Sequence, residues 1–260
     1  MSPAMTTVSV VIPVRDDAEH LRRCLRALAL QTRPPDEIIV VVNGSSDDSA
    51  AIAEDAGARV ATLAAPGIPR AAAHGYDLAV GTVILRLDAD CRPAAGWVAA
   101  MAEDLARRPD VSVFVGGARF FDGPRMLRRP LAAAYLGAYA LIGALALGHL
   151  PLFGSNLALR RAAWLDVRAA VHRDDPELHD DLDLAFHVGE RHRVRYAAHA
   201  AMGISMRPFA SRRAFARRWG RGVRTVLQHW PADFPPVRWV RLALRRVLHR
   251  LRVPHPRRSI

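Results

Sequence analysis

Two aspartates one residue apart, Asp88 and Asp90, close the apolar run VILRLDADC at residues 83–91. A carboxylate at the end of a buried run is costly unless a positive charge neutralises it. That charge could come from Arg86 or Arg92, from a divalent cation, or from a cation that carries a phosphate group. Mg²⁺ and Mn²⁺ prefer oxygen ligands, so two carboxylates at the rim of a cleft suit either ion. The pair is therefore a candidate metal site.

A second group of acids, Asp180, Asp181 and Asp183, stands at the start of the helical pattern ELHDDLDLAFHV at residues 177–188. The helix dipole stabilises anions near a helix N-terminus, so capping alone would explain these acids. A carboxylate that faces a cleft could also accept a proton from a reacting hydroxyl group. Helical geometry sends Asp180 and Asp183 to similar faces and turns Asp181 about 100° away from Asp180. Only the acid that faces a cleft can act on a substrate. If that acid is Asp181, Asp180 would cap the helix or orient a neighbour, and Asp183 would pair with a nearby arginine.

The elements that must position these acids alternate between strand and helix. Apolar and β-branched runs predict buried strands at residues 8–14, 36–44, 58–63, 82–88 and 111–120. Apolar residues at helical spacing predict helices between the strands, at residues 16–31, 45–57, 68–80 and 93–108, the last starting at Pro93. This alternation is typical of an α/β fold with a parallel sheet and right-handed crossovers.

Three polar or turn-forming pairs fall at the carboxyl ends of the predicted strands: Pro13-Val14, Asn43-Gly44, and the aspartates 88 and 90. Open α/β sheets bind their ligands beyond the carboxyl ends of the strands. We therefore expect these residues to share one cleft.

The charge of the chain is strongly asymmetric. All 37 basic residues are arginines, the net charge is +12, and 18 arginines but one acid, Asp233, follow residue 190. This excess favours an anionic partner: membrane lipid, nucleic acid or a phosphorylated substrate. A specific nucleic-acid partner is not expected, because neither an aromatic-bearing sheet nor paired zinc ligands are apparent. Two cysteines, Cys24 and Cys91, and a start without a secretory signal favour a cytoplasmic protein.

Two segments in the second half of the chain are candidates for membrane contact. Residues 131–150 contain no acid or arginine and are long enough to span a bilayer, and Pro151 follows them. We interpret this segment as a buried or membrane-surface helix rather than a span. The segment RWVRLALRRVLHRLR, residues 238–252, predicts either an interfacial helix or a solvated helix packed on the domain. Its apolar face comprises Val240, Leu244, Val247, Leu248 and Leu251.

With its elements placed, the chain resembles the family 2 glycosyltransferases, which have the GT-A fold. The resemblance implies a Rossmann-like, mostly parallel sheet with helices on both faces and a C-terminal basic helical tail. The resemblance rests on five motifs in the family's order, which are VSVVIPVRDD, EIIVVVNGSSDDS, LDADC, GSNLALRR and HDDLDLAFHV. It covers about residues 8 to 220. It implies an inverting, metal-dependent transfer of a hexose from a nucleotide-diphosphate sugar to an acceptor hydroxyl, with Mn²⁺ or Mg²⁺ as cofactor. A lipid-linked or cell-envelope molecule is the expected kind of acceptor.

The resemblance also assigns roles to individual residues. Asp90 is implied as the direct metal ligand, and Asp88 as a contact of the ribose or the metal. The family usually has a Glu-Asp pair where this chain has Asp180-Asp181. Asp181 is therefore implied as the catalytic base. The residues implied to bind the nucleotide base are Pro13, Val14, Arg15 and Asn43.

The chain departs from the family pattern at several positions. Asn43 replaces an acid that reads the base, and Ala72-Ala73 replace an Arg-Asn pair. Arg70 could supply the missing charge. His199 or Ser205, or neither, takes the place of the late histidine ligand. These departures keep a second hypothesis open, a degenerate GT-A protein that binds without catalysis.

The resemblance suggests how the chain is organised. Residues 1–120 would form the nucleotide-sugar-binding half and 121–225 the acceptor-binding half of one domain, with 226–260 as a basic amphipathic tail. Asp90 precedes segment 131–150 and Asp181 follows it, yet both must reach one substrate, which argues against a membrane span between them. We expect a cytoplasmic protein that attaches peripherally to the anionic inner face of the cell membrane.

Overall fold

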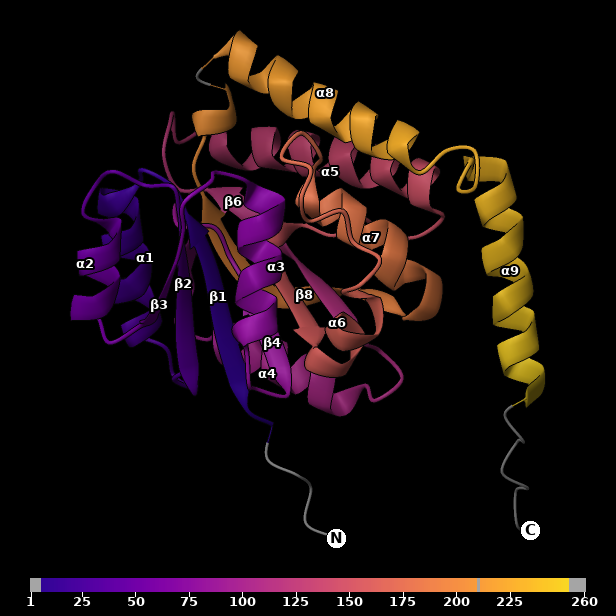
Figure 1. Ribbon diagram of the computed structural model, residues 1–260, viewed down its shortest axis with the longest axis horizontal. Coiled ribbons are helices and arrows are strands. Elements are labelled where there is room, and N and C mark those ends of the chain that lie inside the picture. Colours follow the sequence, from indigo (N-terminus) through magenta and orange to yellow (C-terminus); the bar gives the residue numbers. More distant parts are fainter. Residues whose placement is uncertain (1–5, 210, 253–260) are drawn as a thin grey trace, which may run out of the picture.

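One eight-stranded sheet organises the chain in the computed structural model, which describes residues 6–209 and 211–252 (Figure 1). The strands are β1 Val8–Val14, β2 Glu37–Asn43, β3 Arg59–Leu63, β4 Val83–Arg86, β5 Arg92–Pro93, β6 Val113–Phe120, β7 Leu157–Arg160 and β8 Val194–Ile204. Their order across the sheet is β3-β2-β1-β4-β7-β6-β8-β5. The helices are α1 Ala18–Ala29, α2 Ser49–Asp55, α3 Ile68–Leu78, α4 Trp97–Arg107, α5 Arg128–Leu147, α6 Arg161–Val167, α7 Asp180–Arg191, α8 Arg212–Gln228 and α9 Pro235–Arg252.

The sheet is parallel in its first half and mixed in its second. Strands β3, β2, β1 and β4 are parallel, and so are β6 and β8. Strand β7 runs antiparallel to both β4 and β6. The chain reaches the carboxyl end of β4 through the short 3₁₀ turn Gly154–Asn156, so β7 must run back along β4 from there. The predicted α/β fold with a mostly parallel sheet and helices on both faces is therefore confirmed, and β7 is the strand that makes the sheet mixed.

The predicted helix at residues 93–108 starts too early. Arg92 and Pro93 form β5, which pairs antiparallel with Gly203 and Met202 of β8, and α4 begins only at Trp97. Proline lacks a backbone N–H and is tolerated on an edge strand such as β5. The other predicted strands and helices agree with the observed ones to within a few residues.

Each face of the sheet carries its own hydrophobic core. In β1, Val10 and Ile12 pack on the core beneath α1, α2 and α4, while Val11 packs on the core beneath α3, α6 and α7. Strands buried on both faces are continuous apolar runs, as residues 8–14 are. Because β1 is packed on both faces, its carboxyl end, where Pro13 and Val14 lie, is held in a fixed position.

Helix α5, Arg128–Leu147, overlaps most of segment 131–150, and few of its residues are buried. Its buried residues are Ala132, Gly143 and Leu147, and the exposed large residues include Leu141 and Leu145. Among the described residues it is the one helix long and apolar enough to cross a membrane, with 17% of its most apolar window buried. A buried helix was the wrong alternative for most of this length, because α8 lies beside α5 without covering it fully (Figure 1).

Candidate active site

A buried arginine joins the two groups of acids. Arg86, the last residue of β4, is 2% exposed, and its guanidinium contacts Asp88 at 3.0 Å, Asp180 at 3.1 Å and Asp181 at 2.5 Å. The second carboxylate oxygen of Asp181 accepts a hydrogen bond from the backbone N–H of Gly154 at 2.7 Å. The acids at the end of β4 and at the start of α7 therefore lie at one edge of the sheet.

Asp88 and Asp90 offer oxygen ligands that suit a hard divalent cation. Ligand atoms of Asp88, Asp90 and Cys91 lie within 4.8 Å of one another. The hydroxyl of Ser155 donates to Asp88 at 2.5 Å, and Arg207 Nη2 contacts Asp90 at 2.7 Å. Two carboxylates with this spacing fit Mg²⁺ or Mn²⁺, which keep several waters and need few protein ligands. The buried thiol of Cys91 is too soft a donor to favour these ions.

The electrostatics of these two carboxylates differ. Burial raises the pKa of Asp90, the negative charge of Asp88 raises it further, and Arg207 offsets part of this effect. Burial would also raise the pKa of Asp88, but the Arg86 guanidinium and the Ser155 hydroxyl outweigh it, so this pKa lies below its ordinary value. Asp88 is therefore a carboxylate at neutral pH, and Asp90 is the acid that gains most from an added cation.

Asp181 is buried at 7% exposure, and its surroundings set its acidity. Burial raises its pKa to about 8, against the opposing charge of Arg86. Free aspartate has a pKa near 3.9, so this carboxyl group is shifted toward the pH at which a general base works best. Each oxygen accepts one hydrogen bond, and a carboxylate oxygen has two lone pairs, so each keeps one for a substrate hydroxyl.

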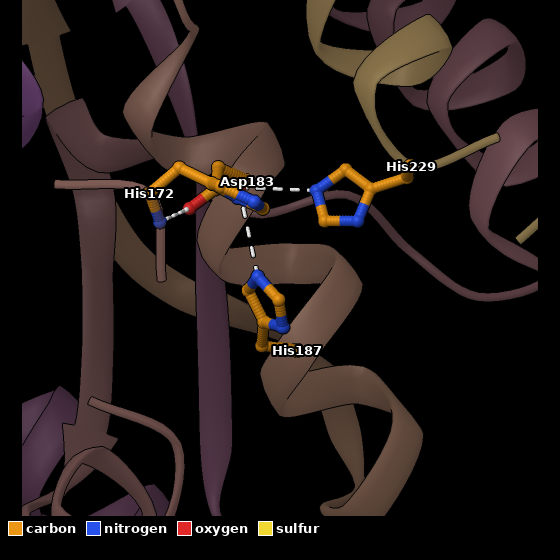
Figure 2. Close-up of side chains that lie close together, drawn as sticks. All are labelled: His172, Asp183, His187 and His229. Atoms are coloured by element: carbon orange, nitrogen blue, oxygen red, sulfur yellow. Dashed lines mark hydrogen bonds and ion pairs between the residues drawn. The ribbon is translucent and has the colours of Figure 1, made fainter. Parts of the chain in front are cut away.

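Asp183 does not contact Arg86, and it lies about 200° around α7 from Asp181. We expected it to pair with an arginine, but its partners are histidines: His172 Nδ1 at 2.7 Å, His229 Nε2 at 3.0 Å and His187 Nε2 at 3.6 Å (Figure 2). The expectation failed because His172 and His229 come from distant segments of the chain.

The residues predicted to bind the nucleotide lie at the ends of β1 and β2. These strand ends are adjacent, since Pro13 pairs with Val41 and Val14 with Val42. Asn43 is buried, and its side-chain oxygen accepts from the backbone N–H of Gly67 at 2.8 Å. It thereby fastens the loop before α3 to the strand end. Arg15 is exposed beside Asp16.

Neither candidate for a further metal ligand belongs to the group of ligand atoms formed by Asp88, Asp90 and Cys91. His199 is exposed on β8, and Ser205 is buried and donates to Asp122 at 2.6 Å. Ser205 Oγ also accepts from the backbone N–H of Arg207, whose side chain bridges Asp90 and Asp17. This bridge links the loop after β1 to the end of β4.

Sequence reasoning missed the roles of three arginines. Arg86 was considered as an ion-pair partner of Asp88, but not as the link to Asp181. An arginine inside a buried strand was the available signal, because such a charge requires partners. Arg207 and Arg218 carried no signal within an arginine-rich tail. Arg70, proposed to supply charge, is paired with Asp174 at 2.7 Å.

A groove of about 360 Å³ between α5 and α8 opens beside the acids. Its walls are almost wholly apolar, with Tyr139 and Ile142 from α5 and Trp219 from α8. His179 and Arg218 line it as well, and His179 directly precedes Asp180. The groove therefore combines hydrocarbon-like walls with positive charge near the acid cluster.

Comparison with known proteins gives a family match over much of the chain. The model of a family described as "Glycosyl transferase family 2" matches residues 9–167. Glycosyltransferase AglE of Haloferax volcanii is 33% identical over 106 residues, which are 38% of this chain and 35% of that protein. A TPR repeat-containing protein of Synechococcus elongatus is 42% identical over 91 residues, 35% of this chain and 22% of that protein. The chain thus matches about a third or less of the length of these curated relatives.

Solved structures share the fold at low identity. Glucosyl-3-phosphoglycerate synthase from Mycobacterium tuberculosis, in complex with Mn²⁺, UDP and glucosyl-3-phosphoglycerate, is 19% identical with a TM-score of 0.61, covering 86% of this chain and 80% of that one. TarS 1–349 of S. aureus is 17% identical with a TM-score of 0.59, covering 78% of this chain and 61% of that one. Likeness at such identities shows the fold alone, and it confirms the predicted GT-A architecture.

Proposed function

Because the chain belongs to glycosyl transferase family 2, we propose that it transfers a sugar from a nucleotide-diphosphate sugar to an acceptor hydroxyl group. The observation that carries this proposal is the contact of Arg86 with both Asp88 and Asp181. This contact places Asp88, which would bind the cation, close to Asp181, which would act as the base. Donor and acceptor must meet between these two groups. The mycobacterial structure that contains Mn²⁺ and UDP supports a uridine nucleotide and a divalent ion as partners.

Asp88 and Asp90 would hold the divalent ion. When bound, a divalent cation supplies Lewis-acid stabilisation to the charge that develops on a departing diphosphate. Arg207, which contacts Asp90, would then bind the diphosphate with its guanidinium, which suits phosphate oxygens. Pro13, Val14 and Asn43 would line the nucleotide base at the ends of β1 and β2.

Asp181 would accept the proton of the acceptor hydroxyl as the new bond forms. A single displacement needs one base and inverts the anomeric configuration, and a positioned base typically contributes about 10²–10⁴ in rate. Arg86 and Gly154 hold the Asp181 carboxylate at a fixed orientation. Asp180, which also contacts Arg86, would share that charge without touching the acceptor.

The acceptor in this proposal is a lipid with an anionic headgroup. The apolar groove between α5 and α8 would receive the hydrocarbon chain, and Arg218 would meet the headgroup. The exposed apolar residues of α9 (Val240, Leu244, Val247 and Leu248) would lie in the membrane surface at the cytoplasmic leaflet. Helix α9 also packs on the domain, because Arg238 is fully buried and donates to the carbonyls of Leu147 and Phe186 at 2.8 Å.

Asp181→Asn tests the proposal directly. The variant should lose transfer by about 10²–10⁴ while it keeps wild-type affinity for UDP-sugar and Mn²⁺, because the base touches the acceptor and not the diphosphate. The assay follows a radiolabelled sugar from a donor panel into lipid and soluble acceptors with and without Mn²⁺. Wild-type turnover in the variant would show that another group is the base. Donor binding without transfer to any acceptor in the wild-type protein would favour the degenerate, non-catalytic hypothesis.

A further inference from the structure

Three histidines and one aspartate from three segments of the chain converge on one point (Figure 2). Asp183 and His187 lie four residues apart on α7 and so share one face of that helix. His172 comes from the loop after α6, and His229 directly follows α8. All four ligand atoms lie within 4.8 Å of one another. This cluster is separate from Asp88 and Asp90 and takes no part in the transfer reaction described above.

Hydrogen bonds account for only part of the arrangement. The ring nitrogens of His172, His229 and His187 lie 2.7, 3.0 and 3.6 Å from the same oxygen, Asp183 Oδ1. The third distance is too long for a hydrogen bond, and among the described residues the buried Nε2 atom of His187 has no hydrogen-bond partner. Two of the nitrogens hydrogen-bond Asp183 Oδ1 and the third faces it without a hydrogen-bond partner in the described part of the chain, so the four atoms form a donor set that hydrogen bonds alone do not account for.

The donor set matches a tetrahedral zinc site. Zinc binds histidine nitrogen and carboxylate oxygen at about 2.0–2.2 Å, which places neighbouring ligand atoms about 3.3 Å apart in a tetrahedron. The three distances to Asp183 Oδ1 bracket that value. The other oxygen of Asp183 accepts from the backbone N–H of His172 at 2.9 Å, which leaves Oδ1 for an ion. His172 is partly exposed and gives an ion access from solvent.

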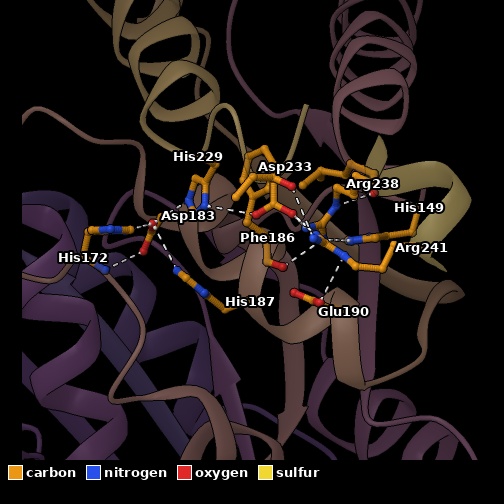
Figure 3. Close-up of polar contacts among 12 residues, drawn as sticks. His149, His172, Asp183, Phe186, His187, Glu190, His229, Asp233, Arg238 and Arg241 are labelled. Carbon is orange, nitrogen blue, oxygen red and sulfur yellow. Dashed lines mark hydrogen bonds and ion pairs between the residues drawn. The ribbon is translucent and has the colours of Figure 1, made fainter. Parts of the chain in front are cut away.

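The groups around the cluster hold its ligands in place (Figure 3). The Nδ1 atom of His229 lies 3.6 Å from Asp233, which is itself paired with Arg238 at 2.9 Å. Metal-bound histidines commonly turn their second nitrogen to a carboxylate, and Asp233 lies on that side of His229 at an ion-pair distance rather than a hydrogen-bond distance. The ring of Phe186 stacks on the ring of His229 at 4.0 Å and fixes its plane.

We propose that His172, Asp183, His187 and His229 bind one zinc ion that fastens the end of α8 to α7. Four protein ligands leave no open position for a substrate, so the site is structural. It connects the helix that carries Asp181 to the segment that leads into α9. The proposal stands on this geometry and is independent of the transfer reaction.

The test uses the full-length protein, freed of metal with a chelator and then equilibrated with Zn²⁺. Metal content is measured by mass spectrometry after gel filtration, and thermal unfolding is recorded with and without Zn²⁺. The wild-type protein should retain about one zinc per chain, and zinc should raise its Tm. Asp90→Asn should retain the same zinc, which separates this site from the sugar-donor site.

Two matched histidine variants decide the assignment. His187→Gln should reduce zinc affinity by at least about 10-fold, which is in the range seen when groups of a metal site are removed. His199→Gln, at an exposed histidine outside the cluster, should retain one zinc. Circular dichroism of the metal-free proteins checks that each variant is folded, and Asp183→Asn provides a second removal of a ligand. Zinc-free wild-type protein, or full zinc content in both His187→Gln and Asp183→Asn, would overturn the proposal.

Discussion

Replacing Arg86 by methionine would leave three carboxylates without the guanidinium that contacts them all. Asp88, Asp180 and Asp181 lie 3.0, 3.1 and 2.5 Å from it, and Arg86 itself is 2% exposed. Removing one partner of a buried ion pair costs about 3–5 kcal/mol, because the remaining charge stays buried and unpaired. In a chain of this size about 1 kcal/mol corresponds to about 2–4 °C in Tm, so the expected decrease is about 6–20 °C.

The assay is thermal unfolding of four proteins: wild type, Arg86→Met, Arg86→Lys and the double variant Arg86→Met/Asp181→Asn. Lysine keeps the charge but presents one ammonium in place of a planar fork, so its Tm should lie between those of wild type and Arg86→Met. The double variant should melt close to Arg86→Met, because Asp181, whose pKa is about 8 even beside Arg86, is uncharged at neutral pH once the arginine is gone. An Arg86→Met protein that melts within about 2 °C of wild type would refute the role of Arg86 as the counter-charge.

Three further predictions concern the metal, the turn beside Arg86 and the tail. Asp90→Asn should lose Mn²⁺-dependent binding of the donor while it stays folded, as isothermal calorimetry would detect; wild-type affinity for donor and metal would contradict the assignment. Gly154→Ala should lower the Tm, because its Cβ would lie 0.8 Å from Arg86 Nη1, whereas Gly96→Ala, with nothing within 4 Å of the added carbon, should leave the Tm unchanged. Equal Tm values for the two alanine variants would rule out this close approach. Serine at four exposed positions of α9 should abolish sedimentation with anionic vesicles without a change in Tm, and sedimentation equal to that of wild type would exclude the tail as the membrane contact. Those four positions are Val240, Leu244, Val247 and Leu248.

The serine variant improves on deletion of the tail from residue 236 onward. Deletion would also remove Arg238, whose side chain is fully buried and bonded to the backbone of α5 and α7. A deleted protein could therefore lose membrane binding because its fold is damaged. The serine positions are more than half exposed, so their replacement separates membrane contact from stability.

Local patterns in the sequence determined most of the elements and the candidate metal-binding pair. Burial on both faces makes a strand a continuous apolar run, so residues 8–14 and 37–43 could be recognised without a structure. Asp88 and Asp90 stand where such a run ends, and carboxyl ends of parallel strands meet at one edge. The fold class and this part of the candidate site followed from those rules.

The partner of each acid was beyond the reach of local patterns. Asp183 was expected beside an arginine, and two of its three histidine partners, His172 and His229, lie 11 and 46 residues away in the chain. The start of α4 was misplaced because β5 pairs with β8, which arrives more than a hundred residues later. The exposure of α5 could not be predicted from its own sequence, because it depends on how much of the helix α8 covers. The composition and hydrophobic periodicity of a segment indicate which of its faces is buried. They do not indicate which side chain from a distant part of the chain packs against that face.

The sequence by itself determined which residues are candidates for the chemistry, since strand ends, acid pairs and motif order are properties of neighbouring positions. Only the tertiary structure decided how they act together. Arg86 and Asp181 are 95 residues apart, and they meet because β7 turns back along β4 through Gly154 while α7 packs beneath it. Such contacts depend on the path of the whole chain, because a buried charge is stabilised by whatever partner the packing brings to it.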